Sequence, residues 1–271
     1  MAITSMDGLI AAMAAGQSLK FYMPSTVGAG SSFFSMNTLV ASSFGQMATA
    51  TAFGSGGTTY TQGTTAGQGW PIWTAGGALT SYLSRFTFST QLAEMLALYD
   101  LMWGCSGFNT TVLTAQSVVG FSGLPPRAPA NGVGLELWCI CYVVDGATAS
   151  QMTVSYTNQS GVSGRTTQAI FINSMVAHKL LLVPLQAGDT GIQSVQSVTF
   201  TASTGTAGNL GLFIMNRLST VSLTVANTNA VADFAGTGLP IINDNAVLFF
   251  NLLCSAGTTG VIIGQVDIAQ G

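Results

Sequence analysis

The chain has 271 residues, of which 48% are hydrophobic and only 6% are charged, and its formal net charge is −3. A typical soluble domain carries about 25% charged residues. The high hydrophobic content argues against intrinsic disorder. The six Lys and Arg residues stand too far apart to form the basic patch that nucleic acid requires. A net charge of −3 on 271 residues causes only weak electrostatic repulsion between copies of the chain. This weak repulsion favours association with further copies or with another protein.

The N-terminal stretch predicts a short helix. Residues 5–15 place apolar side chains at helical spacing, with Ser5 as a suitable N-cap and Gly16 as a suitable stop. A helix this short must dock on another surface to persist. The next residues, 19–23, are expected to be extended and to end at Pro24.

Residues 25–81 carry no charge and are rich in Gly, Ser and Thr, yet large aromatic residues recur in them. A flexible linker would lack these aromatics. Two interpretations remain open: an arm that lies across a neighbouring surface, and a long ordered loop packed on its own domain. In the arm interpretation the aromatics become buried anchors. The predicted interface residues are Phe33, Phe34, Trp70 and Trp73.

From residue 82 onward the pattern is mostly β. Residues 82–88 alternate as a strand does, whereas residues 92–103 fit either a helix or a buried strand. Further strands are predicted at 133–144, 151–157, 166–172, 179–185, 193–202, 209–225, 246–254 and 260–269. Short strands separated by Gly, Asn and Asp turns, without helical crossovers, predict an all-β fold. We expect an antiparallel β-sandwich of jelly-roll type over residues 82–271, with residues 1–81 as a separate helix and arm.

The sequence lacks signals for export, a membrane helix or a zinc site. The first residues have no basic region of the kind that opens a signal peptide. Residues 21–84 and 245–266 carry no charge, but polar residues and glycines interrupt both before eighteen apolar residues accumulate. No C-x-x-C pair exists, so the four cysteines are expected to be buried reduced thiols of a protein made in the cytosol. They are Cys105, Cys139, Cys141 and Cys254.

No motif predicts catalysis. His178 is the only histidine, and no Gly-x-Ser-x-Gly sequence exists to complete a triad with it. Residues 205–211 lack the lysine of a phosphate loop and are expected to form a hairpin turn. Residues 243–245 hold one acid, which makes a poor calcium site. We therefore expect no enzymatic activity, no cofactor and no metal ion.

Four segments carry a resemblance to known proteins. They are residues 98–103, 134–138, 154–161 together with 164–166, and 183–191. Through them the chain resembles, over residues 80–271, a family of structural proteins from tailed-bacteriophage virions. The matching segments are strands and turns, and the family offers no catalytic residues to carry over. The resemblance implies a virion component, above all a capsid decoration or cement protein.

The expected function is therefore structural. The protein would be made in the host cytoplasm and would bind the capsid surface as a homotrimer, with itself and the major capsid protein as partners and with no nucleic acid or membrane. A neck, tail or fibre-attachment protein is a second interpretation. A carbohydrate-binding β-sandwich module is a third. It would use exposed aromatics beside amides, for which Trp70 and Trp73 near Gln68 are the candidates.

Overall fold

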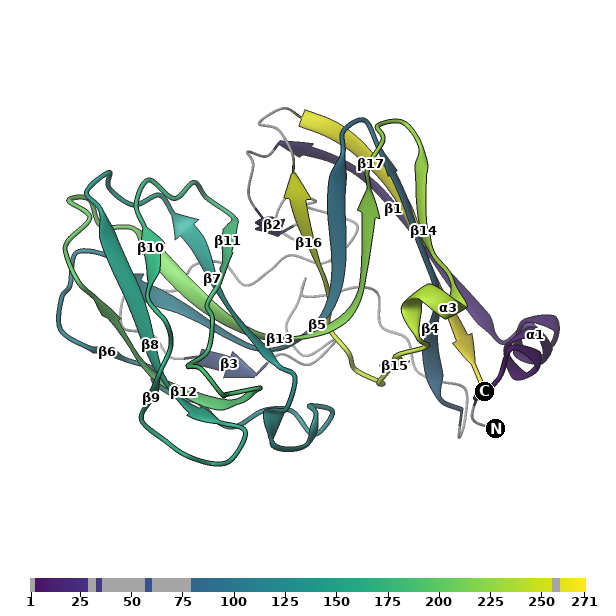
Figure 1. Cartoon of the computed structure of the whole chain (residues 1–271), viewed down its shortest axis with the longest axis horizontal. Coiled ribbons are helices and arrows are strands. Elements are labelled where there is room, and N and C mark those ends of the chain that lie inside the picture. Colours follow the sequence, from purple (N-terminus) through teal and green to yellow (C-terminus); the bar gives the residue numbers. More distant parts are fainter. Residues whose placement is uncertain (1–2, 29–32, 36–56, 60–78, 255–258) are drawn as a thin grey trace. The chain divides into compact units, whose positions relative to one another are not determined.

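The computed structural model describes residues 3–28, 33–35, 57–59, 79–254 and 259–271 (Figure 1). Most of these residues lie in antiparallel strands, and a short helix, α1 (Met6–Ala14), precedes the first strand. The all-β fold class and the N-terminal helix are thus confirmed. The chain forms two compact units. Unit 1 contains residues 1–47, 65–100 and 217–271, and unit 2 contains residues 48–64 and 101–216.

Each of the two units is built from several segments of the chain. The strands β5 (Glu94–Asn109) and β13 (Asn209–Leu223) each contribute one part to unit 1 and another to unit 2. In β5 nearly every position is buried. A strand that is buried on both faces does not show the alternation of apolar and polar residues that marks a strand with one exposed face. This explains why residues 92–103 were ambiguous in sequence.

Unit 1 is a β-sandwich. Its first sheet has the order β1-β17-β4-β14, and β15 also pairs with β4. These strands are β1 (Ser18–Gly28), β4 (Ser81–Thr90), β14 (Asn229–Ala232), β15 (Ile241–Ile242) and β17 (Thr259–Gln270). Facing them, β16 (Leu248–Cys254) pairs with both β2 (Phe33–Ser35) and the first part of β5. The short helix α3 (Phe234–Thr237) follows β14. The core between the sheets contains Phe86 and Phe250, whose ring centroids lie 5.9 Å apart.

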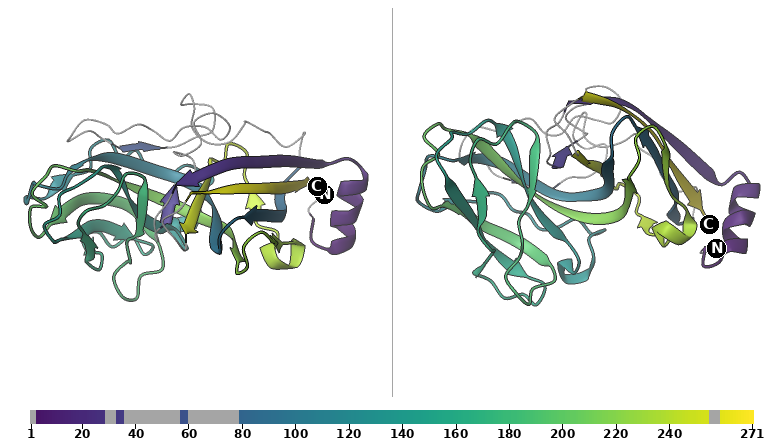
Figure 2. Two further views of the ribbon diagram at one scale, coloured as in Figure 1. Left: turned by 90° about the horizontal axis from the view of Figure 1, so that it is seen from above. Right: turned by 45° about the horizontal axis from the view of Figure 1, so that its top comes forward.

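Strand β1 continues through Pro24 instead of ending there. It pairs with β17 over eleven residues, from Ser18 opposite Ala269 to Gly28 opposite Thr259. The two strands run side by side in both views of Figure 2. In the described strand order β1 lies at the edge of its sheet. Proline is tolerated there because its missing N–H can face away from the ladder. Residues 18–28 are therefore part of unit 1's own sheet.

Unit 2 is also a β-sandwich. Its first sheet has the order β10-β8-β12-β6, and β9 also pairs with β8. These strands are β6 (Gln116–Ser117), β8 (Ser150–Asn158), β9 (Arg165–Thr166), β10 (Ile170–Ile172) and β12 (Ile192–Phe200). Opposite them, β7 (Glu136–Val143) pairs with β11 (Lys179–Leu182) and β13, while β3 (Gly57–Thr59) pairs with β5. The 3-10 helix η1 (Ala130–Gly132) precedes β7. The core contains Trp103, Tyr156 and Phe200.

Two of the connections that carry the chain from one sheet of unit 2 to the other approach each other closely. Residues 201–208 join β12 to β13, which belong to different sheets, so the predicted hairpin at residues 205–211 is wrong. Gly146, between β7 and β8, approaches this connection closely. A Cβ at Gly146 would lie 1.9 Å from the carbonyl oxygen of Thr204. Glycine is therefore required at position 146, because the backbone there passes too close to the backbone at Thr204 to leave room for a side chain.

Candidate functional site

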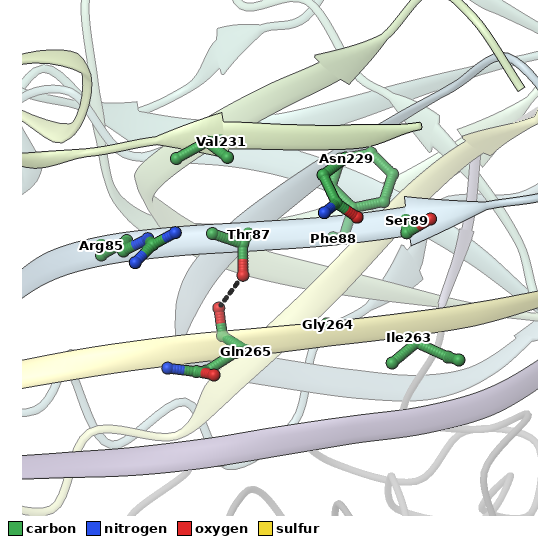
Figure 3. Close-up of a pocket in the computed structure, with 9 residues that line it drawn as sticks. All are labelled: Arg85, Thr87, Phe88, Ser89, Asn229, Val231, Ile263, Gly264 and Gln265. Carbon is green, nitrogen blue, oxygen red and sulfur yellow. Dashed lines mark hydrogen bonds between the residues drawn. The ribbon is translucent and has the colours of Figure 1, made fainter. Parts of the chain in front are cut away.

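The outer face of the first sheet of unit 1 holds an open groove of about 430 Å³ (Figure 3). We call it the sheet-face groove. Three neighbouring strands build it, because the register places Thr87 of β4 opposite both Val231 of β14 and Gln265 of β17. Its lining consists of Arg85, Thr87, Phe88, Ser89, Asn229, Val231, Ile263, Gly264 and Gln265.

The sheet-face groove offers aliphatic carbon and neutral hydrogen-bonding groups. Val231 and Ile263 are 50% and 63% exposed. Between them lie two amides and two hydroxyls, and the Thr87 hydroxyl donates to the backbone oxygen of Gln265 at 3.4 Å. Among the described residues of the lining, Arg85 is the one with an ionised side chain, and it is exposed. Protein interfaces have a similar character, since they retain Arg while other charges are depleted at their centre.

A polar cluster in unit 2 is centred on Asp189. Its carboxylate accepts hydrogen bonds from Asn158 Nδ2 at 2.8 Å, from Arg165 Nε at 3.0 Å and from Arg165 Nη2 at 3.2 Å. The Tyr156 hydroxyl also donates to it, and itself accepts from the backbone N–H of Gln186 at 2.9 Å. Because the Arg165 guanidinium stabilises the ionised carboxyl, the pKa of Asp189 falls to about 2. Both carboxylate oxygens are engaged, so the cluster ties the loop around Asp189 to β8.

The thiols are poor candidates for chemistry. Cys105, Cys139 and Cys141 are free and buried, as predicted for these three. Burial raises the pKa of Cys141 to about 12, and it raises the pKa values of Cys105 and Cys139 well above the usual range. Since the thiolate is the reactive form, these groups stay inert at neutral pH. The fourth, Cys254, ends β16, and its side chain lies outside the described part of the structure.

His178 lies directly before β11, the strand start at which the sequence placed it. Its backbone has a left-handed φ of 68°, and its N–H donates to the Cys141 oxygen at 2.7 Å. Burial lowers the pKa of the imidazole. The described residues contain no group of three or more His, Cys, Asp or Glu side chains that could hold a metal ion. Within the same residues, no helix is long and apolar enough to cross a membrane.

The four predicted interface residues are only partly described. Phe33 and Phe34 lie in β2, opposite Leu253 and Leu252 of β16. Trp70 and Trp73 lie outside the described residues. Sequence reasoning missed the sheet-face groove. The alternation of β4 indicated one polar face, but the residues that complete the groove lie more than a hundred positions further along the chain.

No protein-family model and no curated protein matches the chain. Among solved structures, it is similar to the carbohydrate-binding module CtCBM11, with 13% identity and a TM-score of 0.23 over 60% of this chain and 94% of that one. The VP2 subviral particle of infectious bursal disease virus gives 10% identity and a TM-score of 0.22 over 93% and 80%. The VP1 pentamer of Human Polyomavirus 6 gives 12% identity and a TM-score of 0.21 over 94% of each chain. Such low scores carry no argument about function.

Proposed function

We propose that the protein is a non-enzymatic structural component of a tailed-bacteriophage virion, and more specifically a capsid decoration protein. In this role it binds the head lattice from outside, as a homotrimer that contacts the major capsid protein. It is made in the host cytoplasm and ends on the capsid surface. The sequence resemblance over residues 80–271 supports the virion assignment.

The observation that carries the proposal is a surface with little charge and with large exposed apolar side chains on both units. In unit 1, Ile263 is 63% exposed and Val231 and Ile241 are each 50% exposed. In unit 2, Phe171 of β10 is 70% exposed and Leu182 of β11 is 46% exposed. A protein that works alone in solution normally surrounds such groups with charges of both signs. Here only 6% of residues are charged, which suits surfaces covered by protein in an assembly.

Electron microscopy of native particles, with antibody against this protein as the label, tests the proposal. We expect label and density spread over the whole head lattice. Label confined to the neck, the tail or one vertex would contradict the decoration role and favour the second interpretation. A particle that lacks the protein altogether would overturn the virion assignment.

Carbohydrate binding is a second candidate, and the sheet-face groove favours it. Asn229, Gln265 and Arg85 supply hydrogen-bonding groups, and Ile263 supplies apolar surface. If a glycan binds there, Asn229→Ala and Gln265→Ala should each weaken binding about tenfold, the equivalent of one good hydrogen bond. Gln151→Ala, on β8 of unit 2, is the matched control. A glycan array with no binding to the unaltered protein would remove this candidate.

A further inference from the structure

The sequence contains one Asn-Gly dipeptide, Asn131-Gly132, and it lies in the turn that precedes β7. We call residues 129–132 the η1 turn. Asparagine is a chemically labile residue, and in an unfolded chain a following glycine leaves its side-chain amide open to attack by the next backbone nitrogen. Asn131 is exposed, so water reaches its side chain. The sequence therefore places a reactive dipeptide at an accessible position.

The η1 turn holds this dipeptide in a conformation that does not react. Asn131 has a left-handed backbone, with φ 57° and ψ 17°, which asparagine tolerates better than most residues. At this ψ the Gly132 nitrogen is nearly eclipsed with the Asn131 nitrogen, so it points away from the Asn131 side chain. Its hydrogen is donated to the Pro129 oxygen, with a nitrogen–oxygen distance of 2.9 Å. Attack on the side chain therefore requires the turn to open first.

The backbone at Gly132 is also packed tightly against the start of β12. A Cβ on Gly132 would lie 1.9 Å from the Ile192 oxygen, and a Cβ on Gly191 would lie 2.2 Å from the Gly132 oxygen. The next residue, Val133, forms an isolated antiparallel bridge with Gly191. The turn therefore opens only when these contacts break, and it has no space for an additional main-chain atom.

We propose that Asn131 is a site of spontaneous deamidation, and that opening of the η1 turn controls the reaction. In the open turn the Gly132 nitrogen attacks the side-chain carbonyl carbon of Asn131. A new C–N bond forms and the bond to the amide nitrogen breaks. Ammonia leaves with the proton that the Gly132 nitrogen gives up. Water then hydrolyses the cyclic imide to aspartate or isoaspartate. This modification goes beyond the proposed structural role and does not depend on it.

The two products differ in their effect on the fold. Aspartate leaves the main chain unchanged and adds one exposed carboxylate, and it tolerates a left-handed backbone as asparagine does. Isoaspartate takes the main chain through the former side chain and so lengthens it by one carbon. Because the backbone at Gly132 lacks space, an isoaspartate chain cannot restore the contacts with Ile192 and Gly191. Once it has reacted in this way, the turn cannot close again.

Incubation of the full chain in mildly alkaline buffer, with and without denaturing guanidinium chloride, tests this control. Peptide mapping by mass spectrometry follows the conversion of amide to acid at each asparagine. We expect Asn131 to react at least about a hundredfold more slowly in the folded chain, because the rate follows the population of the open turn. Asn173 is the internal control: it is also exposed, but the side chain of Ser174 hinders the attack. In the unfolded chain Asn173 should react more slowly than Asn131.

Loosening the turn should accelerate the reaction in the folded protein. Ala130→Gly increases the freedom that the chain gains on opening, so the rate at Asn131 should rise about twofold to fivefold. Ala149→Gly is the matched control, since both alanines are exposed and Ala149 follows the opposite end of the eight-residue strand β7. It should leave the rate unchanged. Circular dichroism and the melting temperature verify that each variant is folded.

The stability of the products tests the second part of the inference. Chains that contain isoaspartate, separated by chromatography, should unfold at a lower denaturant concentration than fresh protein. An Asn131→Asp variant adds the charge without the extra main-chain carbon, and it should unfold close to the midpoint of the unaltered protein.

Four outcomes would overturn the inference. They are equal rates at Asn131 in the folded and unfolded chains, faster reaction at Asn173 than at Asn131 in the unfolded chain, equal rates in the two glycine variants, and isoaspartate chains that unfold like fresh protein.

Discussion

Replacing Asp189 by alanine is expected to destabilise unit 2 strongly. The side chain is 4% exposed, and its carboxylate accepts hydrogen bonds from Tyr156, Asn158 and Arg165. Without it, the buried tyrosine hydroxyl loses its acceptor and the guanidinium loses its counter-charge. Leaving donors unsatisfied costs more than the bond itself contributed. The midpoint of urea unfolding at neutral pH, followed by intrinsic fluorescence, should fall clearly.

Two further variants make this expectation specific. Tyr156→Phe retains the buried ring and removes the hydroxyl that bridges Asp189 and the Gln186 N–H, so it should cost about 1–3 kcal/mol. Asp7→Ala removes an exposed carboxylate from α1 and should change the midpoint little. If Asp189→Ala unfolds at the same urea concentration as Asp7→Ala, the cluster does not stabilise the fold.

The stabilisation by Asp189 should also depend on pH in a defined direction. The folded-state pKa is about 2, against 3.8 for the unperturbed carboxyl. A lowered folded pKa means that the unfolded chain binds the proton more tightly. The contribution is therefore complete above 3.8 and is lost as the pH falls from 3.8 towards 2. The urea midpoints of the unaltered protein and of Asp189→Asn should converge over that window, and parallel curves would contradict the assignment.

Local signals were sufficient for most individual elements. The Ser5 cap and the Gly16 stop enclose α1, which spans Met6–Ala14. Alternation identified β4 and β8, because one face of each strand is buried and the other is more accessible. These features depend on residues that are only a few positions apart, so they can be identified from the sequence without knowing the rest of the fold.

The arrangement of the elements could not be predicted in this way. Division into two units depends on β5 and β13, each of which serves both units. Nothing within either strand indicates where one unit ends. The pairing of Ser18 with Ala269 joins nearly opposite ends of the chain. The sheet-face groove likewise needs β4, β14 and β17 together. The strands could be predicted one by one, but their neighbours depend on packing over the whole chain.

The pairing of β1 with β17 leads to the second large prediction. Deleting residues 1–28 removes both α1 and β1, and unit 1 should then lose its cooperative unfolding transition. In the arm interpretation, truncation of residues 1–81 would have left the sandwich folded. However, β1 forms an eleven-residue ladder with β17. Its loss exposes the unpaired edge of a long apolar strand, which promotes aggregation. Light scattering and thermal unfolding of the truncated protein measure both effects.

A shorter deletion separates the strand from the helix. Removing residues 1–15 takes away α1 and leaves β1 paired, so the transition should persist at a lower temperature. The helix contributes only Leu9 and Ala12 to the buried cluster with Tyr82 and Ala269. Hydrogen exchange locates the effect, since β17 amides should open in the longer deletion and stay protected in the shorter one. If the β17 amides stay equally protected without residues 1–28, β1 is dispensable for the sheet and this prediction is wrong.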